Sequence, residues 1–121
     1  MQPWLMAAAA LSLATGMIHI VVGGRFIAQP LLRAGDLQRV PKYTSYYCWH
    51  LVTITVLMMS IMFAWAAAGG SRELALLAVA QAAAFTVWNI VLILWQRLRP
   101  LHFPQWALFL LVTVSGAVGL A

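Results

Sequence analysis

Three histidines, His19, His50 and His102, are the residues of this 121-residue chain whose side chains could do chemistry. An imidazole can ligate a haem or a metal ion, carry a proton, or join two helices by a hydrogen bond. The three together predict a trihistidine site for zinc, copper or iron, whereas His19 and His50 alone predict a haem held between two helices. A third interpretation is that His19 and His50 are neutral and only tie helices together. The residue types leave these interpretations open.

The elements that position these histidines are expected to be transmembrane helices. Hydrophobic residues make up 64% of the chain and charged residues 7%, a composition typical of integral membrane proteins. A helix needs roughly 20 apolar residues to cross a bilayer core about 30 Å thick. Four segments approach that length, namely 3–22, 43–68, 74–95 and 104–121. Because these apolar runs are continuous and not alternating, we expect an all-α, integral membrane four-helix bundle.

Residues 1–121 are expected to form a single transmembrane domain with no soluble second domain. The first segment is interpreted as a retained helix and not as a signal peptide, because no Lys or Arg precedes it. Gly23 and Gly24 are predicted to end the first helix, with Pro30 and Pro41 interrupting the connection 23–42 that follows. Apolar residues alternate with basic ones in this connection, which favours a short interfacial helix there.

The basic residues are distributed unevenly between the two sides of the predicted bundle. Six of the seven lie in or beside the connections 23–42 and 96–103: Arg25, Arg33, Arg39, Lys42, Arg97 and Arg99. Arg72 alone lies on the other side. The positive-inside rule therefore predicts that both connections are cytoplasmic and that the N- and C-termini are extracytoplasmic. This charge favours anionic lipids at the cytoplasmic face as partners and gives no reason to expect nucleic-acid binding.

Helical spacing predicts a polar centre in the cytoplasmic half of the bundle. At 1.5 Å per residue, His19 lies about one turn inside the membrane boundary, and His50 and Asn89 lie about two turns inside it. Polar residues at such depth face the bundle interior and are candidate functional residues. The predicted ligand-binding set is His19, His50, Asn89, Tyr46, Thr53, Trp88 and Arg25. His102 lies in the second connection, and it would have to fold inward to complete a metal site.

The other reactive residues give little support for catalysis. Asp36 and Glu73 are the only acidic residues, and the predicted topology places them on opposite sides, which excludes paired-carboxylate chemistry within one chain. Cys48 is the only cysteine, and we interpret it as a packing residue. Trp49 is interpreted as an anchor at the inner membrane interface. Trp88 lies deeper and could line a cavity.

Four short strings spread over most of the chain carry a resemblance to a family. They are HIVVGGR from His19, PLL from Pro30, YYCWH from Tyr46 and PQW from Pro104. The pattern resembles that of a family of small, uncharacterised four-helix proteins of the bacterial inner membrane. The resemblance implies that location and a multi-pass fold, and it implies no activity because the family has no settled one.

Two classes of function follow from the sequence. The first is a small non-catalytic membrane protein, an accessory subunit that packs against a larger respiratory or photosynthetic membrane complex or forms a homo-oligomer. The second is a stand-alone binder of haem, a metal ion, a quinone or a lipid at the cytoplasmic-side His/Asn centre. We favour the first class because the chain has no complete set of ligands and no soluble domain.

Overall fold

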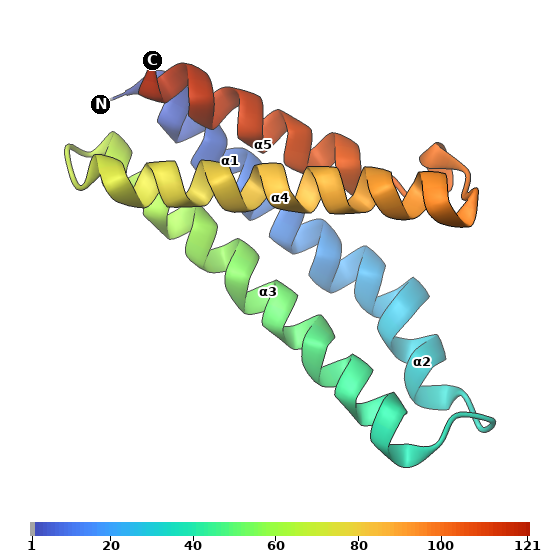
Figure 1. The fold of residues 1–121 in the computed structure, drawn as a ribbon. Coiled ribbons are helices and arrows are strands. Elements are labelled where there is room, and N and C mark those ends of the chain that lie inside the picture. Colours follow the sequence, from blue (N-terminus) through green and yellow to red (C-terminus); the bar gives the residue numbers. More distant parts are fainter. Residues whose placement is uncertain (1) are drawn as a thin grey trace.

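The computed structural model describes residues 2–121, which form four long helices and contain no strand (Figure 1). The first long helix runs from Pro3 to Arg33 and joins three segments: α1 (Pro3–Ile18), η1 (His19–Ala28) and α2 (Gln29–Arg33). The others are α3 (Arg39–Ala67), α4 (Arg72–Gln96) and α5 (Gln105–Leu120), with a 3₁₀ turn, η2 (Pro100–His102), before α5. The predicted all-α four-helix fold is therefore confirmed.

Three of the helices, Pro3–Arg33, α3 and α4, are long and apolar enough to cross a membrane. The fourth, α5, is apolar but has only 16 residues. At 1.5 Å per residue it is about 24 Å long, shorter than a bilayer core of about 30 Å.

The predicted end of the first helix at Gly23 and Gly24 is wrong. The helix continues through both glycines as the π-helical segment η1, in which the N–H of Gln29 donates to the carbonyl of Gly24, five residues earlier. The wider π turns precede Pro30, which lacks an N–H and whose ring would crowd the carbonyl four residues before it in a regular α-helix. The connection to α3 therefore shrinks to residues 34–38, and α2 continues the first helix instead of forming a separate interfacial one.

The four helices form two pairs that diverge from a common end (Figure 1). One pair consists of the first helix and α3, and the other of α4 and α5. Both termini and the α3–α4 hairpin lie where the pairs meet, and we call this the terminal end. The connections 34–38 and 97–104 lie at the far ends of the two pairs. We call these far ends together the basic end, because six of the seven basic residues lie in or near them.

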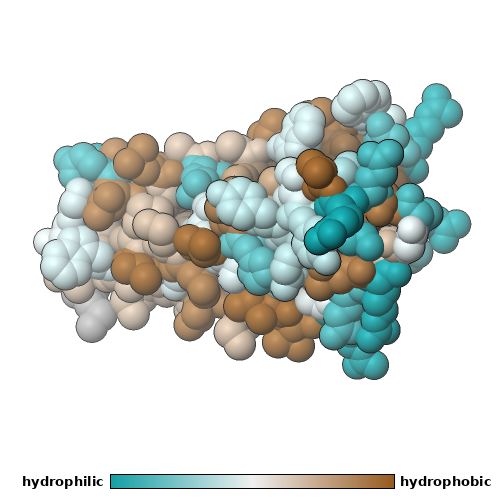
Figure 2. All heavy atoms as spheres, turned by 90° about the horizontal axis from the view of Figure 1, so that it is seen from below, coloured by the Kyte–Doolittle hydropathy of each residue, from teal (hydrophilic) through white to brown (hydrophobic). Residues whose placement is uncertain are grey.

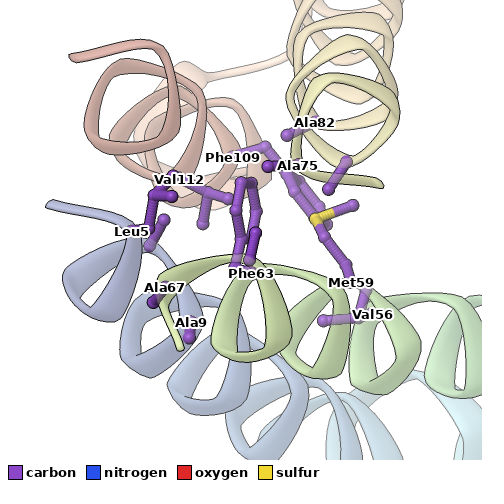
Figure 3. Packing of buried hydrophobic residues seen from close by; sticks show 13 residues of the cluster. Leu5, Ala9, Val56, Met59, Phe63, Ala67, Ala75, Ala82, Phe109 and Val112 are labelled. Carbon is purple, nitrogen blue, oxygen red and sulfur yellow. The ribbon is translucent and has the colours of Figure 1, made fainter. Parts of the chain in front are cut away.

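A buried apolar core joins all four helices toward the terminal end (Figure 3). Phe63 of α3 is fully buried and reaches the backbone of α5 at Gly116, where a Cβ atom would lie 2.8 Å from its Cε1. Alanines at Ala8, Ala75 and Ala78 are also fully buried, which lets the helix backbones approach closely. This core fixes the four helices to one another at the terminal end only.

The core does not extend along α3 to the basic end. The first buried residue of α3 is Val56, so its first 17 residues, Arg39 to Thr55, contain none. Figure 2 shows hydrophilic residues gathered at the basic end and hydrophobic residues over much of the rest of that face. The half of α3 nearest the basic end is therefore packed against the first helix alone and is open on its other sides.

Candidate functional site

Trp49 of α3 is the residue around which the predicted site is built. The His19 ring stacks on the Trp49 ring with centroids 4.5 Å apart, and His19 Nε2 lies 3.1 Å from the backbone oxygen of Trp49. Because a carbonyl oxygen only accepts, this bond places a proton on Nε2 of His19. Gly23 and Gly24 lie beside the indole, where a Cβ atom would be 3.6 Å and 4.0 Å from it. These are ordinary van der Waals distances, so the indole lies beside both glycines and would leave room for a methyl group at either.

His50 also lies against Trp49. Its ring meets the Trp49 ring edge-on at 4.9 Å and the Tyr46 ring edge-on at 4.6 Å. The His50 side chain is exposed, and no hydrogen bond joins it to any of residues 2–121. Thr53 donates to the carbonyl of Trp49, one turn earlier in its own helix. The structure thus brings together four of the predicted site residues, His19, Tyr46, His50 and Thr53, around Trp49.

Asn89 does not belong to this cluster. It is buried on α4, where its Oδ1 accepts a hydrogen bond of 3.0 Å from the backbone N–H of Trp106, at the first turn of α5. Asn89 lies on a buried face of α4, but this face is turned to α5, and α4 diverges from α3. Asn89 therefore satisfies a free N–H at a helix start, which is a structural role.

Trp88 and His102 also lie apart from the histidine cluster. Trp88 is 59% exposed on the outside of α4, so it lines no cavity within the chain. His102 is exposed in η2, at the end of the other helix pair. Among residues 2–121, no three His, Cys, Asp or Glu side chains lie together in an arrangement that could hold a metal ion. The three histidines are thus not assembled as the trihistidine site that their types suggested, because the two helix pairs diverge.

Arg25 is exposed on η1 and lines a groove with Tyr46 and Trp49. The sequence placed Arg25 at the end of the first helix, whereas the helix continues past it to Arg33. Trp49 was assigned only an anchoring role. A signal for Trp49 was present in the chain: a large ring on one helix and two adjacent glycines on the next are complementary in shape. The predicted depths of these residues in the membrane did not show that the ring and the glycines would be in contact.

The cluster provides a contact between two helices and an imidazole that is free to bind a ligand. The stacked His19 and Trp49 rings, with the bond to the Trp49 carbonyl, hold α3 on the first helix where no deeper core does so. The imidazole of His50 keeps both nitrogens free for a partner or a ligand from outside the chain. The chain's two carboxylates, Asp36 and Glu73, are not among these residues, so the cluster offers no paired-carboxylate chemistry.

Comparison of the chain with protein-family models, with curated proteins and with solved structures gives no match.

Proposed function

We propose that this chain is a small, non-catalytic, multi-pass protein of the bacterial inner membrane that packs as an accessory subunit against a larger respiratory or photosynthetic complex. The observation that carries the proposal is the open half of α3. Its residues from Arg39 to Thr55 include none that is buried, although they belong to a helix long enough to span a membrane. A partner helix seated there would complete the packing that this chain leaves unfinished.

The chemistry of the open half favours a protein neighbour over lipid tails. His50 is exposed there, lies on the membrane side of Cys48, and has no hydrogen bond within residues 2–121. A polar group facing hydrocarbon without a hydrogen bond is costly, so polar residues at membrane depth almost always face protein. Cys48 was expected to pack inside the bundle, and its exposure is instead consistent with a contact outside the chain. The proposed partner therefore presents hydrogen-bonding groups to this half of α3.

The proposed topology follows from the charges at the two ends. The basic end carries six of the seven basic residues, and in bacterial membranes such ends face the cytoplasm. The terminal end, with both chain termini, then faces the outside. Because α5 packs along α4, we propose that it crosses the membrane beside α4 in spite of its shorter length.

The natural cysteine provides a direct test of the proposed contact. Cys48 is the only cysteine and is exposed on the open half of α3. Membranes containing the chain would be treated with a maleimide photocrosslinker and irradiated. We expect a product that joins the chain at Cys48 to a different membrane protein, identified by mass spectrometry and present in the same purified complex.

A matched control places the same crosslinker elsewhere. In a Cys48→Ser background, Leu77→Cys puts the only cysteine on an exposed site of α4, away from α3's open half. This variant should give little of the same product. Equal yields from both positions would contradict a specific contact. A product containing only two copies of this chain would contradict the subunit proposal and indicate a homo-oligomer.

A second candidate function is supported by His50 itself. An exposed imidazole with free nitrogens, beside the aromatic rings of Tyr46 and Trp49, could ligate a haem or bind a quinone supplied from the bilayer. The absorption spectrum of the purified protein tests this candidate. A Soret band lost in His50→Gln and kept in His102→Gln would favour it, and a spectrum of aromatic residues alone in freshly isolated protein would refute the haem version.

A further inference from the structure

A groove of about 390 Å³ lies between the first helix and α3, toward the basic end. Arg25 and Gln29 line it from the first helix and Tyr46 lines it from α3, so one part offers a guanidinium, a carboxamide and a phenol hydroxyl. Ile20 and Val21 line the same groove and make another part of it apolar. A ligand that uses the whole groove must be both polar and apolar.

The polar part of the groove favours an anion. The chain has only two acidic residues, Asp36 and Glu73. Glu73 is at the terminal end, where it accepts a hydrogen bond from Ser71. Asp36 is thus the one acidic residue at the basic end, among six basic ones. The charge of Arg25 is therefore not balanced within this region, which attracts anions.

Helix lengths place the groove at the membrane boundary. A bilayer core about 30 Å thick takes about 20 helical residues. Counted from the start of the first helix, the twentieth residue is Val22, and counted back from the end of α3 it is Cys48. Arg25 then lies about one turn outside the core, at the depth of lipid headgroups, while Ile20 and Val21 lie just inside it.

We infer that this groove binds one anionic phospholipid. Its phosphate accepts hydrogen bonds from the guanidinium of Arg25, with Gln29 and Tyr46 within the same groove as further donors. Its acyl chain lies along Val21, which is 62% exposed. A free phosphate ion would share the polar contacts, but it would leave the apolar part of the groove unused. The site requires only this chain and is independent of the partner proposed for α3.

The test is native mass spectrometry of the purified full chain in detergent, titrated with phosphatidylglycerol or phosphatidylcholine. We expect one phosphatidylglycerol to bind in preference to phosphatidylcholine. Arg25→Gln should weaken phosphatidylglycerol binding by about tenfold, the loss expected when one charge-assisted pair is removed. Arg99→Gln is the matched control, because Arg99 is an exposed arginine at the basic end that does not line the groove.

Equal losses in the Arg25 and Arg99 variants would overturn the site and indicate diffuse attraction to a basic surface. Millimolar inorganic phosphate should leave the bound lipid in place, and its complete displacement would assign the groove to free phosphate. If Arg25→Gln does not fold, judged by its circular dichroism, Gln29→Leu serves instead because Gln29 is exposed. That variant should bind phosphatidylglycerol about threefold more weakly, and unchanged binding would contradict the inference.

Discussion

Replacing Gly116 by alanine tests the close packing that holds the helix pairs together at the terminal end. A Cβ atom at this position would lie 2.6 Å from Cγ2 of Val79 and 2.8 Å from Cε1 of Phe63. Ordinary carbon contacts are about 3.5–4.0 Å, so both neighbours must move. Overpacking of this kind costs about 1–3 kcal/mol, whereas alanine gains about 1 kcal/mol over glycine in a helix. We therefore expect Gly116→Ala to lower the free energy of unfolding by about 1 kcal/mol.

The matched control is Gly24→Ala, at a helical glycine with room for a methyl group. The nearest atom to a Cβ there is Cη2 of Trp49, at 4.0 Å. We expect this variant to be more stable by up to about 1 kcal/mol, from helix propensity alone. Both free energies of unfolding would be measured by titrating the protein in mild detergent with SDS and following far-UV circular dichroism. A Gly116→Ala variant as stable as Gly24→Ala would show that the helices are not closely packed at Gly116.

The remaining predictions concern three buried or partly buried polar side chains. Ser60→Ala should cost about 0.5–1 kcal/mol in the same SDS titration, because Ser60 Oγ donates a 2.8 Å hydrogen bond to the carbonyl of Ala9 across two helices. Ser12→Ala should leave the protein equally or more stable, since the buried Ser12 hydroxyl has no partner among residues 2–121; a loss as large as that of Ser60→Ala would contradict this. Asn89→Ala should cost about 1 kcal/mol, because it frees the Trp106 N–H at the start of α5. It should leave the ring resonances of His19 and His50 in NMR spectra unchanged, and a shift of either ring would contradict the separation of Asn89 from the histidine cluster.

Much of the fold could be predicted because long, continuous apolar runs are a strong indication of membrane helices. The helix predicted over 74–95 is observed as α4, Arg72–Gln96, and the helix predicted over 104–121 is observed as α5, Gln105–Leu120. The first helix was harder, since two adjacent glycines often end a helix. Here Trp49 packs over them and the backbone widens into a π-helix, and this long-range contact is not encoded in the local sequence.

The candidate site was only partly predictable for a different physical reason. Spacing along a helix predicts the depth of a residue and which other residues lie on the same helix face. This spacing predicted that His19, His50 and Tyr46 lie near one another, as they do around Trp49. Spacing does not give the angle between helices. The divergence of α4 from α3 therefore separated Asn89 from His50, although both had been placed at the same depth.

We propose that this 13.3 kDa chain works as part of a larger membrane assembly. The most direct measurement is the mass of the particle that contains it, obtained by native mass spectrometry after membranes are solubilised in mild detergent. We expect a stable complex that includes other membrane proteins and that weakens when His50 is replaced by Leu. A particle made only of this chain, with or without a bound haem, would contradict it.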